Sequence, residues 1–187
     1  MLFTPTQVHA AFVIDLERRT DERGFFARTW CQREFAAHGL TANVVQINVS
    51  QNKKRGTLRG MHYQLAPFEE AKTVSCTKGA IYDVVLDLRR GSPTYLRWDA
   101  FELTAENRRM LHIPEGCAHG FQTLTDDTEL LYFMSEFYAP EQHRGVRYDD
   151  PAFGITWPLP AEALTVADQS WPDYTQPGRH AIRPIDR

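Results

Sequence analysis

The side chains of this sequence that could carry out chemistry lie in three stretches: His62 with Lys72 shortly after it, His119 in IPEGCAHGF, and Tyr132. A histidine can remove a proton near neutral pH because its unperturbed pKa is about 6.5. A lysine can hold a developing negative charge, and a tyrosine can donate a proton. Each residue also has a structural interpretation, as a hydrogen-bonded histidine, a strand-edge lysine or a core aromatic ring. Residue type alone therefore leaves both interpretations open.

The spacing around the two histidines resembles the cupin signature. In Pro114-x-Gly116-x-x-His119 the proline and glycine predict a tight turn, after which a strand carries the histidine inward. The first half of a cupin signature normally offers His-x-His and a glutamate to a metal, whereas this sequence has His62-Tyr63-Gln64 with Glu69 further on. A strand keeps His62 and Gln64 on one face. Because an amide is a poor ligand for zinc or iron, we expect no metal, which disfavours a metal-dependent oxygenase.

Further strings follow one another along the chain in a fixed order, and none of them is specific alone. They are DERGFF (21–26), Gln46-x-Asn48-x-Ser50, LRGMHYQLAP (58–67) followed by Lys72, DVVLDLRRGSPT (83–94), IPEGCAHGF (113–121), Tyr132 and Tyr138 with PE (140–141), DDP (149–151) and WP (157–158). In this order they resemble the dTDP-4-dehydrorhamnose 3,5-epimerase family, the nucleotide-sugar epimerase branch of the cupins. The resemblance covers about residues 3–174.

The resemblance implies an isomerase of deoxysugar or surface-polysaccharide biosynthesis that converts dTDP-4-dehydro-6-deoxy-D-glucose to dTDP-4-dehydro-L-rhamnose. The ketone at C4 acidifies the hydrogens on C3 and C5, so a base can remove either one. An acid on the opposite ring face then returns a proton with inverted configuration. The family pattern makes His62 the base, oriented by Asp168, with Tyr132 as the acid and Lys72 holding the charge on O4. No cofactor is implied, because the substrate carries its own ketone.

The resemblance also implies a set of substrate-binding residues and a homodimer in which an N-terminal strand crosses to the partner's sheet. Arg23 and Arg59 are expected to bind the pyrophosphate, since a guanidinium forks onto phosphate oxygens. The sugar and nucleotide pocket is expected to be lined by Gln46, Asn48, His119 and Tyr138. The apolar residues Phe3, Val8, Phe12 and Val13 precede the first motif, where a lone barrel would leave them exposed.

The sequence departs from the usual family pattern at four positions. Arg28 and His143 replace glutamates, Ile47 stands where an aspartate is common, and Ala167 replaces a lysine. None belongs to the acid–base set, so the reaction type is retained while the nucleotide and the sugar stay open. The alternatives are an epimerase of one carbon or of another nucleotide sugar, and a cupin that only binds such a ligand. Joint retention of an acid and a base argues against mere binding.

The elements that must position these residues are short strands. Ala80–Leu88 alternates, with Tyr82, Val84 and Leu86 on one face and Asp83 and Asp87 on the other. Similar strands are predicted at Thr73–Cys76, Leu96–Leu103, Arg109–Ile113 and Glu129–Tyr138, the last of which would place Tyr132 and Tyr138 on one side. One helix is predicted at Cys31–His38, with Gly39 at its C-terminus. The fold class is therefore all-β, a jelly-roll barrel or β-sandwich with a few short helices.

Length and composition are consistent with this assignment. We expect one cupin domain over residues 1–187, with its core at about 3–174 and an irregular tail at 175–187. A net charge of −3 gives no reason to expect a nucleic-acid or membrane partner. The three cysteines lack zinc spacing, and the first residues lack a signal-peptide pattern, so a cytoplasmic protein is expected. Of the histidines, His9, His38, His143 and His180 have no motif around them and are expected to be exposed.

Overall fold

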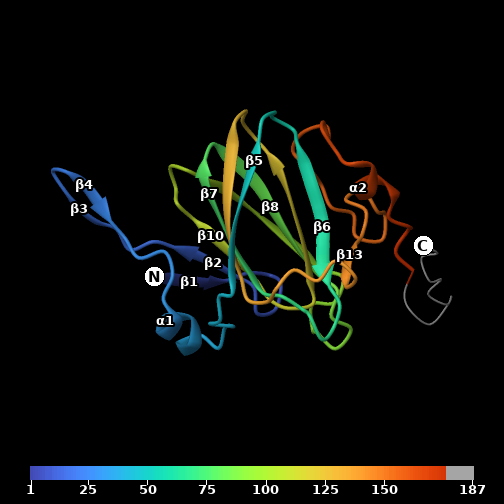
Figure 1. The fold of residues 1–187 in the computed structure, drawn as a ribbon, viewed down its shortest axis with the longest axis horizontal. Coiled ribbons are helices and arrows are strands. Elements are labelled where there is room, and N and C mark those ends of the chain that lie inside the picture. Colours follow the sequence, from blue (N-terminus) through green and yellow to red (C-terminus); the bar gives the residue numbers. More distant parts are fainter. Residues whose placement is uncertain (176–187) are drawn as a thin grey trace.

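The computed structural model describes residues 1–175 and places most strands in two antiparallel sheets that face each other (Figure 1). One sheet has the strand order β1-β2-β10-β7-β12-β5, and the other has the order β13-β6-β11-β8-β9. The described residues form only two helices, both short. The predicted all-β cupin architecture is therefore confirmed.

The first sheet consists of β1 (Leu2–Pro5), β2 (Phe12–Asp15), β5 (Gln46–Asn52), β7 (Lys72–Lys78), β10 (Met110–Ile113) and β12 (Thr128–Met134). The second consists of β6 (Leu58–Gln64), β8 (Ala80–Asp87), β9 (Trp98–Thr104), β11 (Cys117–Thr123) and β13 (His143–Gly145). A separate hairpin pairs β3 (Arg19–Asp21) with β4 (Gly24–Phe26), and the helices are α1 (Gln32–Ala37) and α2 (Val166–Ser170).

Strand β8 shows how the interior combines an apolar core with a polar site. Its residues Ile81 and Val85 belong to the core cluster between the sheets, together with Val74 and Leu130 of the facing sheet. Asp83 has the same parity as Ile81 and Val85, so this carboxylate also lies on the interior side and is fully buried. The predicted alternation is thus correct, and the face that carries the aspartate is the interior one. A buried carboxylate needs a hydrogen-bond partner, which the site provides.

The other face of β8 is buried as well, because the chain after β13 covers the outside of this sheet. Val84 and Leu86 pack there against Val146 and Phe153, with Tyr174 at the edge of the cluster. The chain after Pro158 reaches this cluster through Tyr174. The predicted irregular tail at 175–187 lies almost entirely outside them. Neither α2 nor the short strand β13 was predicted, since both are too short to show a period.

The predicted helix is present in the structure, but one predicted strand ends earlier than expected. The predicted helix is confirmed as α1, and Gly39 follows it with a φ of +69°, a left-handed conformation that favours glycine. The strand predicted to run to Tyr138 ends at Met134, so the prediction that Tyr138 and Tyr132 share one strand side is wrong. Tyr138 lies in the exposed loop that follows β12.

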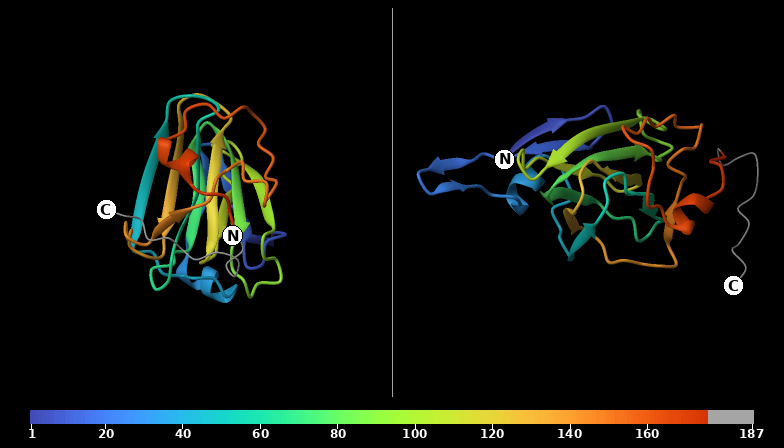
Figure 2. Two further views of the ribbon diagram at one scale, coloured as in Figure 1. Left: turned by 90° about the vertical axis from the view of Figure 1, so that its right-hand side faces the viewer. Right: turned by 90° about the horizontal axis from the view of Figure 1, so that it is seen from above.

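The N-terminal strands pair within the chain. β1 pairs with β2, which pairs in turn with β10. The expectation that the apolar residues before the first motif would be exposed is wrong, because Val8 and Val13 are buried and Phe3 and Phe12 pack beside α1. The β3–β4 hairpin is the segment that projects instead, away from both sheets (Figure 2). No helix within residues 1–175 is long and apolar enough to span a membrane.

Candidate active site

A cavity of about 460 Å³ opens between the two sheets. This volume lies within the range of about 300–1,000 Å³ that small-molecule sites occupy. Its walls combine cationic, acidic and aromatic side chains from both sheets and from the segment around α2. The lining residues are Asn48, Val49, Ser50, Arg59, His62, Lys72, His119, Phe121, Tyr132, Met134, His143, Thr165, Ala167 and Asp168.

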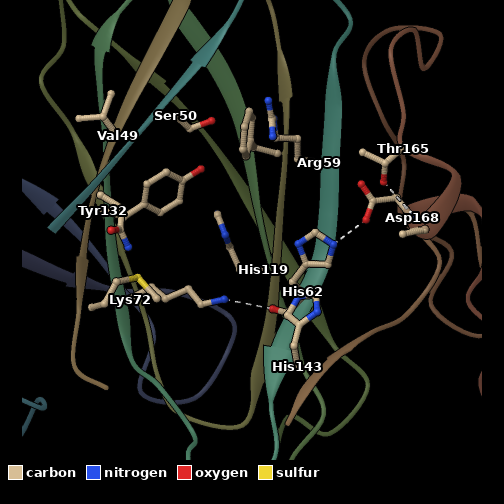
Figure 3. A pocket seen from close by; sticks show the side chains of 14 residues that line it. Val49, Ser50, Arg59, His62, Lys72, His119, Tyr132, His143, Thr165 and Asp168 are labelled. Carbon is tan, nitrogen blue, oxygen red and sulfur yellow. Dashed lines mark hydrogen bonds and ion pairs between the residues drawn. The ribbon is translucent and has the colours of Figure 1, made fainter. Parts of the chain in front are cut away.

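His62 and Asp168 form a hydrogen-bonded pair on one side of this cavity. His62 comes from the middle of β6, and its Nε2 lies 2.6 Å from the Asp168 Oδ1. The carboxylate accepts the Nε2 proton, so the other ring nitrogen is left as the basic atom. Figure 3 shows that this nitrogen faces the cavity. The imidazole is therefore oriented as a proton acceptor by a carboxylate behind it.

The short helix α2 presents Asp168 to His62. Thr165 caps its N-terminus, because the Thr165 hydroxyl accepts a hydrogen bond from the Asp168 backbone N–H at 3.1 Å. Burial alone would raise the pKa of the Asp168 carboxyl. The hydrogen bonds from His62 and Thr165 outweigh burial and hold this pKa below its usual range. Asp168 is therefore ionised at neutral pH, as a residue that orients a base must be.

Lys72 lies at the bottom of the cavity, at the first position of β7. Its Nζ donates to the His62 carbonyl oxygen at 3.3 Å (Figure 3). The same Nζ forms an ion pair with Glu70 Oε1 at 2.8 Å. Both side chains of this ion pair are buried. The ammonium group is thus fixed beside His62, where low dielectric strengthens its attraction for a negative charge in the cavity.

A second histidine–carboxylate pair lies beside the first. His119 of β11 is directly opposite His62 of β6 in the ladder, and its Nε2–H donates to Asp83 Oδ1 at 2.7 Å. The two strands approach closely because glycines meet there: a Cβ at Gly60 would lie 2.4 Å from the Cα of Gly120. Asp83 was not among the predicted site residues, although its position on the polar face of β8 marked it as unusual.

Tyr132 reaches the cavity from the opposite sheet. Its ring lies 6.1 Å from the His119 ring in an edge-to-face contact, and its hydroxyl points into the cavity toward Ser50 and Arg59 (Figure 3). Burial and, second, the nearby Asp83 carboxylate hold the pKa of Tyr132 well above its usual range. The phenol therefore keeps its proton at neutral pH. The cavity thus holds a proton acceptor and a proton donor on facing walls.

His143 is part of this site, and the expectation that it would be exposed is wrong. It comes from β13, which pairs with β6, and its ring centroid lies 4.9 Å from that of His62. Burial, followed by the proximity of His62 and Lys72, lowers the pKa of His143. His143 is therefore a neutral ring beside the base. The sequence could not place it, because β13 has only three residues.

The structure brings seven of the ten predicted site residues to the cavity: Asn48, Arg59, His62, Lys72, His119, Tyr132 and Asp168. Three others lie elsewhere in the chain. Arg23 is in the projecting hairpin, its side chain is 84% exposed, and it pairs with Asp21. Gln46 accepts a hydrogen bond from the Tyr138 backbone N–H at 2.9 Å, so these two residues support each other outside the cavity wall.

Gln64, which occupies the second ligand position of the cupin metal signature, is engaged by the backbone. Its amide nitrogen donates to the Phe68 and Phe137 carbonyl oxygens at 2.7 and 3.2 Å, and its oxygen accepts from Ala139 at 2.6 Å. Among residues 1–175 no three His, Cys, Asp or Glu side chains are grouped as a metal site requires. Gln64 instead ties the loop after β12 to β6.

The cavity wall offers two cationic side chains, Lys72 and Arg59, to a ligand. Glu70, Asp83 and Asp168 are each already paired with Lys72, His119 and His62. Arg59 contributes a further cation. Its Nε donates to the Asn52 side-chain oxygen at 2.8 Å, so the two terminal nitrogens of the guanidinium are not used in that bond. A polar ligand with developing negative charge fits this wall, and the acid–base pair can move its protons.

Comparisons with known proteins agree with this chemistry. The family model described as dTDP-4-dehydrorhamnose 3,5-epimerase matches residues 5–176. A dTDP-4-dehydrorhamnose 3,5-epimerase of Sinorhizobium fredii is 40% identical over 177 residues, which cover 94% of this chain and 91% of that protein.

Two solved structures add information on ligands. A dTDP-6-deoxy-D-glucose-3,5-epimerase of Legionella pneumophila, in complex with dTDP-4-keto-L-rhamnose, superimposes with a TM-score of 0.84 at 33% identity and covers 94% of this chain and 99% of that one. A 3'-monoepimerase of Streptomyces bikiniensis, in complex with dTDP-quinovose, has a TM-score of 0.83 at 34% identity, with 90% and 86% of the two chains covered.

Proposed function

This chain belongs to the dTDP-4-dehydrorhamnose 3,5-epimerase family, and from that premise we propose that it inverts C3 and C5 of dTDP-4-dehydro-6-deoxy-D-glucose. The product is dTDP-4-dehydro-L-rhamnose, a precursor for deoxysugar and surface-polysaccharide synthesis. The observation that carries this proposal is the placement of His62 and Tyr132 on facing walls of one cavity (Figure 3). Inversion requires a base and an acid on opposite faces of the sugar ring, and this geometry supplies both.

His62 is the base in this account. Its free ring nitrogen removes the hydrogen from C3 or C5, which the C4 ketone has acidified. The imidazolium that results is stabilised by the Asp168 carboxylate at 2.6 Å, which is already ionised and fixed by its helix cap. Because an acid–base group contributes about 10²–10⁴-fold to a rate, His62 is expected to be the most sensitive single position of the site.

Lys72 and Tyr132 complete the reaction. The negative charge moves from carbon to O4, where the buried Lys72 ammonium stabilises the enolate. Tyr132 then gives its proton to the opposite face of the same carbon. His62 then gives its proton to solvent and Tyr132 takes one up from solvent, after which the same steps at the second carbon give the doubly inverted sugar. The reaction uses no redox partner, because the ketone of the substrate serves as the electron sink and is regenerated.

The remaining polar residues bind the nucleotide and the sugar in this proposal. Arg59 and Arg23 hold the diphosphate, and Asn48 and His119 contact the sugar and the nucleobase, whereas Gln46 and Tyr138 lie outside the cavity wall and hold each other in place. Arg23 lies in the hairpin at the end of the molecule opposite to α2, so it reaches a cavity only if that cavity belongs to another subunit (Figure 1). We therefore propose a homodimer in which the β3–β4 hairpin of each subunit approaches the partner's cavity.

The exposed surface of the hairpin supports this dimer. Phe26 is 70% exposed and Phe25 is also exposed, although both are large apolar residues. The hairpin strands pair only with each other among the described residues, and an isolated two-stranded hairpin is only marginally stable in water. A second copy that covers these rings accounts for both observations.

The described cysteines are all unpaired thiols, which supports a place in the reducing cytoplasm.

Deuterium incorporation tests the proposed reaction. The protein is incubated with dTDP-4-dehydro-6-deoxy-D-glucose in heavy water, and the product is followed by NMR. We expect deuterium at both C3 and C5 with inverted configuration. Label at one carbon only would replace the proposal by a single-carbon epimerase. Binding of the nucleotide sugar without any label would identify a binding protein and contradict the proposal.

A further inference from the structure

The helix that carries Asp168 makes little contact with the barrel through its own residues. Of the five residues of α2, only Asp168 is buried, and Val166 is 83% exposed. A helix this short has no independent stability. Something outside α2 must therefore fix its distance from β6, since Asp168 has to lie 2.6 Å from His62.

Trp171, which directly follows α2, is the nearest large side chain that can act as this anchor. Its indole packs against the backbone of Gly145, so closely that a Cβ on Gly145 would lie 2.4 Å from both Cε2 and Nε1 of the ring. Its ring is also 6.2 Å from that of His143. The backbone φ of Gly145 lies outside the left-handed region, so the close approach of Trp171 is the reason why a side chain does not fit here.

The position of Gly145 connects this packing to the base. Gly145 is the ladder partner of His62 in the pairing of β13 with β6. The contacts therefore form a closed path: from His62 across the ladder to Gly145, through Trp171 into α2, and through Asp168 back to the His62 ring. The distance between the Trp171 ring and the Gly145 backbone therefore sets where α2, and with it the Asp168 carboxylate, lies relative to the imidazole.

Other anchors of this segment lie farther from Asp168 along the chain, among them the Tyr174 backbone N–H, which donates to the buried Asp150 Oδ2 at 2.6 Å. Before α2, the Glu162 backbone N–H donates to the Gly56 carbonyl at 2.9 Å. After it, Arg147 forms an ion pair with Asp173 at 2.5 Å, and the Asp173 side chain is 68% exposed. An exposed ion pair of this kind stabilises little.

The packing of Trp171 also has a feature that folding alone does not favour. Its indole Nε1 is buried and has no hydrogen-bond partner within the part of the chain that the structure describes. A buried donor without an acceptor destabilises the folded state. A tryptophan in this place is thus better explained by the volume that it sets between β13 and α2 than by its polar group.

We propose that Gly145 and Trp171 are positioning residues, which together hold α2 at the height where Asp168 orients His62. This inference rests on the proposed function, because it concerns the base of that reaction. It gives Gly145, a residue without a side chain, a role in the geometry of the His62–Asp168 hydrogen bond.

The test combines a double-mutant cycle with a signal that does not require substrate. Gly145→Ala, Trp171→Ala, the double variant and Gly91→Ala are compared with the wild type. Gly91 is the matched control, because a Cβ there meets nothing within 4 Å and its φ is not left-handed. The signal is the low-field imidazole N–H proton of the His62–Asp168 hydrogen bond, assigned by its loss in Asp168→Asn. The corresponding proton of His119 and Asp83 serves as an internal reference.

We expect Gly145→Ala to lose the His62 signal while the His119 signal stays, and to lower kcat about tenfold or more with little change in KM. Trp171→Ala should have a similar effect. The double variant should equal Trp171→Ala within about twofold, because alanine at 145 has no ring to displace once Trp171 is gone. Gly91→Ala should match the wild type. If Gly145→Ala does not fold, Trp171→Phe must keep the His62 signal that Trp171→Ala loses.

The proposal is overturned if Gly145→Ala keeps both the His62 signal and kcat, or if its loss in kcat multiplies with that of Trp171→Ala. It is equally overturned if Trp171→Phe loses the signal as fully as Trp171→Ala. Failure of the proposed reaction would look different. In that case the wild type would incorporate no deuterium, while the proton signal of the free protein would still report whether Gly145 and Trp171 hold Asp168 in place.

Discussion

At the scale of residues, the cavity contains two histidine–carboxylate pairs that differ in their access to the ligand. The His62 side chain is 29% exposed, whereas that of His119 is 6% exposed. A base must reach its substrate and change its protonation state, which suits the more open His62. The deeper His119 is held on both sides, by Asp83 and by the ring of Tyr132, which suits a fixed hydrogen-bonding role.

This difference predicts unequal losses when each carboxylate becomes an amide. Asp168→Asn removes the charge that stabilises the imidazolium of the base, so kcat should fall by about 10²–10⁴-fold. Asp83→Asn disturbs only the orientation of a binding residue, so the fall in kcat should be smaller in this variant than in Asp168→Asn. Steady-state kinetics on both variants measure these losses, with folding verified by circular dichroism. A larger loss in Asp83→Asn than in Asp168→Asn would reverse the assignment of the base.

The sequence allowed a residue's role to be predicted where that residue lies in a motif string. His62, Lys72 and His119 lie in such strings, and the structure brings all three to one cavity. Asp83 was missed although it stands in one of the strings, because a strand's alternation does not say which face is interior. In β8 the outer face is also buried, by the chain after β13, so hydrophobicity could not distinguish the two.

At the scale of elements, helix α1 and the six-stranded sheet enclose a histidine that the reaction does not use. His112 of β10 is buried against Phe35 of α1 and shares a hydrogen bond with the Thr73 hydroxyl of β7 at 3.0 Å. Burial lowers the pKa of His112 to about 4. The junction between α1 and this sheet therefore requires a neutral imidazole.

This buried imidazole makes stability depend on pH. Because the folded pKa of His112 lies below the unfolded value of about 6.5, the unfolded chain binds the proton first. Below pH 6.5 the folded state should lose up to about 1.4 kcal/mol of stability per pH unit from this group, until His112 also protonates near pH 4. His112→Gln, which keeps an acceptor for Thr73 and cannot titrate, should flatten this dependence. Urea unfolding at pH 7, 6 and 5 measures it, and equal slopes in both proteins would contradict the prediction.

The elements that the sequence failed to predict share a physical cause. β13 and α2 have three and five residues, fewer than a period needs to become visible. Both are held by partners far away in the chain, His62 for Asp168 and β6 for β13. The strand predicted to continue to Tyr138 ends early because its backbone turns at residue 135 into the loop that Gln64 ties down.

At the scale of the whole molecule, the hairpin and the cavity lie too far apart within one chain to cooperate. Figure 1 places β3 and β4 at one end and α2 at the other. Motif strings give the order of residues along a chain and cannot say which subunit completes a site. The sequence therefore predicted Arg23 as a ligand without indicating whose cavity it would serve, and the proposed dimer is what would bring it to one.

Subunit complementation tests the proposed exchange of Arg23 between subunits. His62→Ala and Arg23→Ala are each expected to form weakly active homodimers. In a mixed dimer, the subunit that keeps His62 receives Arg23 from its partner and has one intact site. After dissociation and random reassociation of equal amounts, the mixture should regain up to about a quarter of the wild-type rate. No gain on mixing, with dimers verified by light scattering, would show that Arg23 does not act across subunits.

The division of labour between His62 and Tyr132 is the central claim, and Tyr132→Phe tests it most directly. This variant keeps the ring volume, the base and Lys72, so the enolate can still form. It lacks the donor on the opposite face, so His62 reprotonates the face from which the proton came, and it delivers deuterium once its imidazolium has exchanged with solvent.

The measurement follows deuterium exchange and inversion in the same NMR sample in heavy water. We predict that Tyr132→Phe exchanges ring hydrogens with solvent while producing little inverted sugar, and that His62→Ala does neither. Inversion by Tyr132→Phe at the wild-type rate would contradict the assignment of the acid. Exchange by His62→Ala would contradict the assignment of the base.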